Sequence, residues 1–233
     1  MKDKISLAHV HLETQLVISD EFVQLLIVEN PGEFYAMVTD LDGQFNGREG
    51  QFVFSCDGGF IAPSKCGEMV SDLFHFGLND KKILTLLHRR LESTALGEMV
   101  EKYQTVNTCF VSMMEELSFS VPFAIDYSEP QPIDYLKAAG VRFEENYESL
   151  EEKIICYLNA LIELKKCKFF IFVNLKSVLS DEKLSQLYAH CKAEQVGLLL
   201  IENAKIRPLL PCERAVIVTE DLCEILENYG EVC

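Results

Sequence analysis

Residues 168–203 contain two uninterrupted apolar runs with an amphipathic segment between them. The runs Phe169–Val173 and Leu198–Ile201 are typical of parallel strands that are covered on both faces of a sheet. Between them, Ser180 can cap a helix whose first turn holds two acids, where the helix dipole favours negative charge. Apolar residues then recur at the spacing of one helix face, at Leu184, Leu187, Tyr188 and Cys191. The pattern predicts a strand, a helix and a second parallel strand, and therefore an α/β domain.

The N-terminal third predicts further strands and one helix. Apolar runs at 16–18 and 22–28 predict two strands. Asn30 precedes a proline, an arrangement that starts helices, and Gly43 is expected to end the helix that follows. Residues 52–62 hold two short apolar runs around a glycine-rich turn, which predicts a β-hairpin.

The chain changes character between Asn79 and about Leu117, where a long helix interrupted only by Gly97 is predicted. Roughly 40 helical residues would extend about 60 Å, which is too long for a small domain to enclose. The apolar residues of its second half are spaced alternately three and four apart, as in a coiled coil, and form a narrow stripe: Leu96, Met99, Tyr103, Val106, Phe110, Met113 and Leu117. A matching stripe in a later helix suggests antiparallel pairing within one chain, at Leu150, Ile154, Leu158 and Leu161. The stripe could instead pack between chains.

These patterns define the expected domains. The head is predicted to combine residues 1–78 with 167–233, and residues 79–166 are predicted to form an inserted helical arm. The predicted fold class is α/β, with a Rossmann-like, degenerate P-loop NTPase-like head.

Composition indicates a folded protein of a reducing cytoplasm. The chain has 233 residues, 48% hydrophobic and 25% charged, which is ordinary for a globular protein with one good core. It shows no apolar run long enough to span a bilayer and no apolar segment typical of a secretory signal. Its nine cysteines lack paired spacing, which argues against a disulfide framework or a zinc ribbon. Cys109, Cys156 and Cys191 fall on apolar helix positions and are expected to pack as small core residues.

The net charge of −16 argues against nucleic-acid binding unless the cations gather on one surface. One candidate group lies near the start of the long helix, where two lysines precede two arginines by seven to nine positions. These four residues are expected to share a face: Lys81, Lys82, Arg89 and Arg90. A second group follows the returning helix and would lie near the first if the arm is an antiparallel hairpin: Lys165, Lys166 and Lys168. The helix dipole alone could explain this second group. Without a recognition motif, any DNA contact should be to the backbone.

Two segments, one acidic and one with two histidines, contain residue types that can bind metals. Asp126, Ser128, Glu129 and Asp134 offer three carboxylates and a hydroxyl around one loop, and Ca²⁺ prefers such oxygen ligands. A solvated acidic loop is the equally weighted alternative. His9-Val-His11 could direct two imidazoles to one face of a strand, but the sequence suggests no third ligand, and a surface strand is the favoured interpretation.

The sequence does not predict an enzyme. It contains no G-x-G-x-x-G, and the nearest approach to a P-loop, at 59–66, lacks the second glycine and the Mg²⁺-binding hydroxyl. Asn174 stands where an NTPase strand would end in an acid, although Glu202 keeps one at the end of the next strand. No nucleophile and base can be paired, and neighbouring acids such as Glu151 and Glu152 point apart. We therefore expect a nucleotidase-like scaffold that binds no nucleotide.

Three segments resemble the small accessory protein encoded in type II-A CRISPR loci. FFIFVNLKSVLSDEKLSQLYAHCKAEQVGLLLIEN is similar to the C-terminal half of that family, through a strand ending in Val-Asn, a Leu-Ser-Asp-Glu helix start and a strand ending in Ile-Glu. FGLNDKKIL resembles the entry into the family's long helix, and LKAAGVRFE resembles a third family segment. The similarity extends over most of residues 76–219 and lies in the order and spacing of segments.

The resemblance implies a non-catalytic factor of spacer acquisition. Members of this family are expected to form a ring-like homotetramer around double-stranded DNA near free ends, with Ca²⁺ supporting the assembly. The resemblance places the Ca²⁺ ligands in the segment 126–134, where Ser128 replaces an aspartate of the family pattern. It implies a CRISPR integrase and a guide-directed nuclease as partners, and no membrane. The alternatives are a cytosolic oligomeric interaction protein that binds no nucleic acid and, with less support, a divergent nucleotide-binding protein.

Overall fold

The computed structural model describes residues 4–230, which divide into two compact units. The larger unit joins the chain up to Phe76 with the chain from Tyr147 onward, and the smaller unit is Gly77–Asn146. Within residues 4–230, no helix is both long and apolar enough to cross a membrane.

The larger unit is built on a six-stranded sheet with the order β10-β9-β3-β8-β7-β6. Five neighbouring strands run parallel: β9 (Glu213–Val218), β3 (Val23–Val28), β8 (Gly197–Glu202), β7 (Phe169–Val173) and β6 (Gly67–Val70). The edge strand β10 (Glu224–Asn228) pairs antiparallel with β9. Every residue of β3, β7 and β8 is buried, as the apolar runs predicted. A side chain at Gly67 would overlap the ring of Phe169, so a glycine lets β6 and β7 pack closely here.

A second, antiparallel sheet has the order β2-β1-β4-β5. Its strands are β1 (Ile5–Ala8), β2 (Leu16–Ile18), β4 (Val53–Cys56) and β5 (Gly59–Phe60). The hairpin of β4 and β5 confirms the prediction for residues 52–62, and its turn places Asp57 and Gly58 in the left-handed region. Helix α1 (Pro31–Phe45) contributes Met37 and Leu41 to the core that this sheet shares with β3, β7 and β8.

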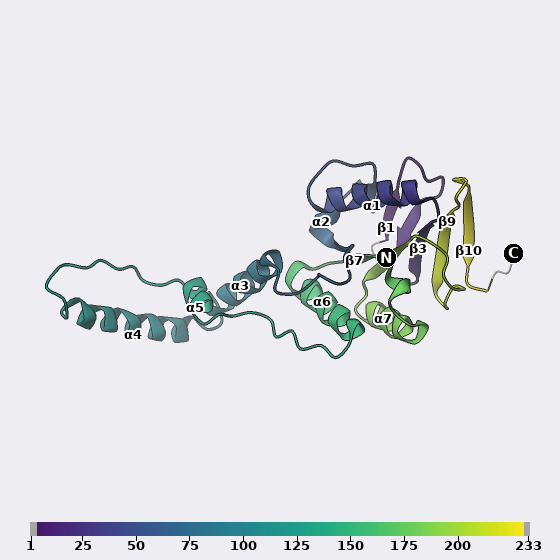
Figure 1. The fold of residues 1–233 in the computed structure, drawn as a ribbon. Helices are drawn as coiled ribbons and strands as arrows, with labels where there is room; N and C mark the ends of the chain where they lie inside the picture. Colours follow the sequence, from purple (N-terminus) through teal and green to yellow (C-terminus); the bar gives the residue numbers. More distant parts are fainter. Residues whose placement is uncertain (1–3, 231–233) are drawn as a thin grey trace. The chain divides into compact units, whose positions relative to one another are not determined.

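The remaining helices of the larger unit are α2 (Pro63–Cys66), α6 (Leu150–Lys165), the 3₁₀ helix η1 (Leu175–Ser177) and α7 (Asp181–Ala193). Figure 1 shows the helices together with both sheets. Ser180 caps α7 as predicted, and all four predicted apolar positions of α7 are buried. Helix α1 begins after Asn30 as predicted, but it continues past Gly43, which is buried in the helix, and ends at the Asn46 cap. Cys191 is buried as expected, Cys156 is partly buried, and Cys109 is exposed, so its predicted core position is wrong.

Helix α6 corrects the predicted domain boundary. Its apolar stripe, expected to pair with the long helix of the arm, instead belongs to the larger unit, where α6 lies beside α7. Ile154, Leu158 and Leu161 are almost fully buried there. The periodicity predicted the apolar face of α6 correctly, but a stripe of leucine and isoleucine does not specify which surface will cover it. The inserted segment is therefore Gly77–Asn146 rather than 79–166.

The smaller unit contains α3 (Lys81–Leu96), α4 (Val100–Ser118) and α5 (Pro132–Ala138). The long helix is interrupted at Gly97, as predicted, and resumes at Val100. The Gly97 N–H still bonds the Ser93 carbonyl 3.0 Å away. The two ends of this unit are joined by a hydrogen bond that Asn79 Nδ2 donates to Glu145 Oε2 at 2.6 Å.

The apolar stripe of the smaller unit is largely uncovered. Tyr103 donates a hydrogen bond to the Pro130 carbonyl, and the Phe110 ring lies edge-on to Tyr135. The exposed members of the stripe are Leu96, Met99, Val106, Met113 and Leu117. Helix α6, from which a partner for this stripe was expected, belongs to the other unit.

Candidate nucleic-acid interface and metal sites

The first basic group lies on α3 and is exposed to solvent. All four of its members are exposed: Lys81, Lys82, Arg89 and Arg90. At about 100° per residue, Lys82 and Arg89 lie about 20° apart around the helix, whereas Lys81 and Arg90 lie about 180° apart. The group therefore covers about half of the helix surface instead of sharing one narrow face. Lys82 and Arg89 form its central line, which we call the α3 basic line.

The second basic group is part of the larger unit and is engaged there. Lys165 Nζ lies 2.7 Å from the Gly67 carbonyl oxygen and 2.5 Å from Glu68 Oε2, and its side chain is only 20% exposed. Lys166 caps α6 in the left-handed conformation and pairs with Glu163 at 3.2 Å. Lys165 therefore ties α6 to β6, and its predicted contact with DNA stays a prediction. Lys166 is exposed, but a nearby carboxylate offsets its charge.

The predicted Ca²⁺ segment lies in the loop before α5 and in the first turn of α5. Asp126 and Ser128 are exposed, and Glu129 Oε2 accepts a hydrogen bond from Asn107 at 3.2 Å. Asp134 Oδ2 accepts the Gln131 N–H at 2.9 Å, which caps α5. In the structure of residues 4–230, the ligand atoms of these three carboxylates do not all lie within 4.8 Å of one another. Ca²⁺ binding here stays a prediction.

A different trio does bring its ligand atoms together: His9, His11 and Glu33 lie within 4.8 Å of one another. The two histidines lie in the turn that follows β1 instead of on a strand, and Glu33 lies in the first turn of α1. Burial, with help from the nearby His11, lowers the pKa of His9, although Asp40 and Glu33 act in the opposite direction. The sequence showed the His-x-His pair but could not show its third member, because only the packing of α1 against the β1–β2 turn brings Glu33 there.

The carboxyl ends of the parallel strands are the usual ligand-binding edge of an α/β sheet. After β7, Asn174 adopts a left-handed conformation and its Oδ1 accepts the Asn203 N–H at 3.1 Å. At the end of β8, Glu202 Oε1 accepts the Lys176 N–H at 2.9 Å, while its other oxygen is buried without a hydrogen-bond partner among residues 4–230. Burial raises the pKa of Glu202 to about 7. Lys176 itself is buried and pairs with Glu213 at 2.7 Å. These side chains bond one another and the neighbouring backbone.

The turn from β3 into α1 is the other place where an α/β fold can hold a phosphate, because helix N-termini present free N–H groups. Here Asn30 Oδ1 accepts from Gly32 N at 3.0 Å and from Glu33 N at 3.1 Å. Pro31 contributes no N–H. The donors that would surround a phosphate are therefore used by the helix cap.

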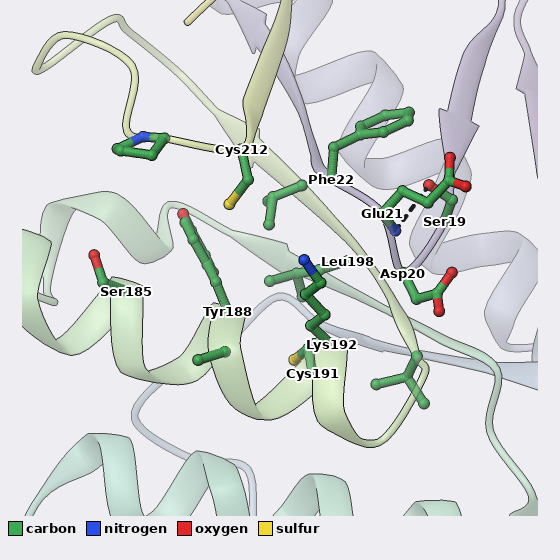
Figure 2. A pocket seen from close by; sticks show the side chains of 14 residues that line it. Ser19, Asp20, Glu21, Phe22, Ser185, Tyr188, Cys191, Lys192, Leu198 and Cys212 are labelled. Carbon is green, nitrogen blue, oxygen red and sulfur yellow. Dashed lines mark hydrogen bonds between the residues drawn. The ribbon is translucent and has the colours of Figure 1, made fainter.

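A pocket of about 340 Å³ lies between α7 and the amino ends of β3 and β8 (Figure 2). Its lining includes Phe22, Val23, Tyr188, Lys192, Leu198 and Cys212. The Tyr188 hydroxyl donates to Glu213 Oε1 at 2.7 Å and so is already used. This pocket is at the edge opposite to the usual nucleotide-binding edge of a parallel sheet.

The family model for the CRISPR-associated protein Csn2 matches residues 44–222. That range covers well over half of the chain. The chain belongs to the Csn2 family of type II-A CRISPR proteins. A curated relative, the CRISPR-associated protein Csn2 of Streptococcus agalactiae, is 23% identical over 144 residues. The alignment covers 60% of this chain and 65% of the relative, which is just under two thirds of the relative's length.

A comparison with solved structures matches an ATP-binding cassette at a TM-score of 0.50 and an ABC exporter at a lower score. A nucleotide-free cassette of an ABC transporter has a TM-score of 0.50 at 10% identity, covering 97% of this chain and 92% of that chain. A bacterial Atm1-family ABC exporter with ATP bound has a TM-score of 0.46 at 8% identity, covering 94% of this chain and 37% of that chain. At 10% identity, the likeness to the nucleotide-free cassette concerns the fold alone. The family match confirms the resemblance that the sequence segments indicated.

Proposed function

We propose that this Csn2-family chain is a non-catalytic factor of CRISPR adaptation that binds double-stranded DNA ends without sequence specificity, as a ring-like homotetramer. The observation that carries the proposal is the exposed α3 basic line, Lys82 and Arg89, in a family member whose net charge is −16. Phosphate neutralisation supplies most sequence-independent DNA affinity. A chain this acidic needs its cations collected on one surface of an assembly.

The proposed scaffold is a degenerate P-loop NTPase-like domain that has lost nucleotide chemistry. Asn30 occupies the helix donors that a phosphate would need, and Asn174 replaces an acid at the end of β7. Glu202 keeps a carboxylate, but it is buried and bonded to the backbone of Lys176. The polar groups at this edge serve to hold the fold together, which supports a binding role over catalysis.

Self-association is supported by the uncovered apolar stripe of α4. Val106 and Met113 are each about half exposed, and an exposed stripe with heptad spacing is a surface that another helix can cover. In a ring, four copies of the α3 basic line would face the DNA while the acids remain outside. Ca²⁺ at 126–134 would offset some of the acidic charge. The integrase and the guide-directed nuclease of the same system are the proposed protein partners.

The decisive experiment compares DNA molecules of one sequence and length in three forms: linear, covalently closed, and linear with streptavidin bound at biotin on both ends. Threading predicts binding to the open linear form and a large loss for the other two. The blocked linear form separates a need for free ends from an effect of DNA topology. Equal binding to all three forms would refute the ring. Failure to bind any form at low salt with Ca²⁺ present would favour the interaction protein that binds no nucleic acid.

A further inference from the structure

We propose that His9, His11 and Glu33 form a binding site for a divalent transition metal of the Zn²⁺ type, with one coordination position left open. Among the residues from 4 to 230, this is the cluster in which three potential ligand atoms lie within 4.8 Å of one another. Two imidazole nitrogens and one carboxylate are the ligand set of many zinc sites that keep a fourth position for water.

Two of the three ligands are held in place by the fold. His9 is buried, and its ring packs on Phe52 with centroids 4.3 Å apart. Glu33 lies in the capped first turn of α1, and its side chain is only 15% exposed. His11 is more than half exposed, so it can adjust its rotamer and leaves a path for an ion to enter. The site therefore combines two fixed ligands with one adaptable ligand.

The present distances require a small rearrangement on binding. Zinc ligands lie about 2.0–2.2 Å from the ion, so tetrahedral neighbours are about 3.3 Å apart. His11 Nδ1 lies 2.5 Å from Glu33 Oε1, a hydrogen bond that an ion would replace by two metal bonds. His9 Nδ1 accepts the His11 backbone N–H at a long 3.2 Å, and this bond is lost if Nδ1 ligates the ion. The binding free energy therefore has to offset the His11–Glu33 hydrogen bond, and also the bond to His9 if Nδ1 is the ligand atom.

The site differs chemically from the oxygen-rich segment 126–134. Ca²⁺ and Mg²⁺ prefer oxygen ligands, whereas imidazole favours zinc and its neighbours in the first row. His75 provides an internal comparison, because its ring also bonds a carboxylate, Asp72, at 2.7 Å, but belongs to no three-ligand cluster in the described structure. A bound ion would join the β1–β2 turn to α1. The same turn is also held by Glu224, which accepts the Thr14 N–H at 3.0 Å.

The test titrates Zn²⁺ into the chelator-treated, full-length protein by calorimetry, with Ca²⁺ and Mg²⁺ as comparison ions. The expected result is one Zn²⁺ per chain with a raised melting temperature. His11→Ala and Glu33→Gln should each weaken the affinity by at least about 100-fold, since loss of a ligand should exceed the usual effect of losing a supporting contact. His75→Ala is the matched control and should bind as the parent does. No Zn²⁺ binding by the parent, or unchanged affinity in both ligand variants, would overturn the proposal.

Cobalt substitution separates this site from the cysteines. Co²⁺ bound to His and carboxylate ligands should show visible d–d bands without an intense near-ultraviolet sulfur-to-cobalt band. A strong sulfur band that persists in His11→Ala would assign the metal to thiols and refute the proposal. Circular dichroism of both variants checks that lost binding does not arise from lost folding. His9→Ala is less suitable, because that ring is buried against Phe52.

Discussion

Lys165 places its ammonium group 2.5 Å from the carboxylate of Glu68, and this pair joins the last turn of α6 to β6. The Gly67 carbonyl accepts a second hydrogen bond from the same Nζ at 2.7 Å. Both charged side chains are largely shielded from water, so removing either one would leave the other charge partly buried without its partner. A cation that seemed available for DNA in the sequence is used to hold the sheet and the helix together.

This pairing leads to a prediction about DNA affinity. Lys82→Ala and Arg89→Ala should each lower affinity for linear duplex equally across sequences and reduce the log–log salt slope by about 1, because each removes one phosphate contact. Lys165→Ala should leave that slope unchanged and lower the melting temperature instead, because it leaves Glu68 without its ion-pair partner. Fluorescence anisotropy over a range of salt concentrations measures the slopes. A slope reduced as much by Lys165→Ala as by Lys82→Ala would contradict the structural role of Lys165.

The uncovered stripe of α4 predicts how the protein self-associates. Replacing Val106 and Met113 with Glu should lower the mass measured by light scattering, because charges would be buried without partners in an apolar contact between chains. Thr108→Glu adds one such charge at an exposed position of the same helix, off the stripe, and should not change the mass. An unchanged mass in a folded Val106, Met113 variant would show that α4 does not join the chains.

Ca²⁺ should raise the melting temperature more than Mg²⁺ does, through residues 126–134. A ligand that binds only the folded state at a hundredfold excess over Kd stabilises it by about 2.7 kcal/mol. Joint replacement of Asp126 by Asn and Glu129 by Gln should abolish this gain, since it removes two oxygen-donating charges. Glu116→Gln, an exposed acid on α4, and Glu33→Gln should retain it. Identical melting curves in EDTA and in millimolar Ca²⁺ would remove the predicted site.

Glu202 predicts a pH dependence of stability. Burial raises the pKa of its carboxyl from 4.5 to about 7. The folded state therefore holds the proton more tightly than the unfolded state, so the free energy of unfolding should fall as pH rises from about 4.5 to about 7. The loss is at most about 3 kcal/mol, given 1.36 kcal/mol per pKa unit.

Glu202→Gln isolates this effect, because the amide keeps an oxygen for the Lys176 N–H but cannot ionise. Denaturant melts of both proteins at several pH values give the difference in unfolding free energy. As pH rises from about 4.5 to about 7, the unfolding free energy of the parent should fall relative to that of the Gln variant. Parallel stability curves for the two proteins would show that Glu202 keeps an ordinary pKa.

The strand–helix–strand unit was predictable from sequence because its determinants are local. Continuous apolar runs, the Ser180 cap and the apolar spacing of α7 each act over a few neighbouring residues, and the structure confirms all of them. The start of α1 at Asn30 and the hairpin of β4 and β5 were predictable for the same reason. The helix end predicted at Gly43 was wrong, because burial in the core offsets the low helix propensity of one glycine.

By itself, the sequence determined the elements, their apolar faces, the cap residues and the segments that resemble the Csn2 family. Tertiary structure decided which partner each face received. The apolar face of α6 is buried in the larger unit, whereas the stripe of α4 stays exposed. Lys165 is paired with Glu68. It also brought Glu33 to His9 and His11. The physical reason is that local patterns fix where a side chain points along its own element, whereas a neighbour distant in sequence depends on how whole elements pack.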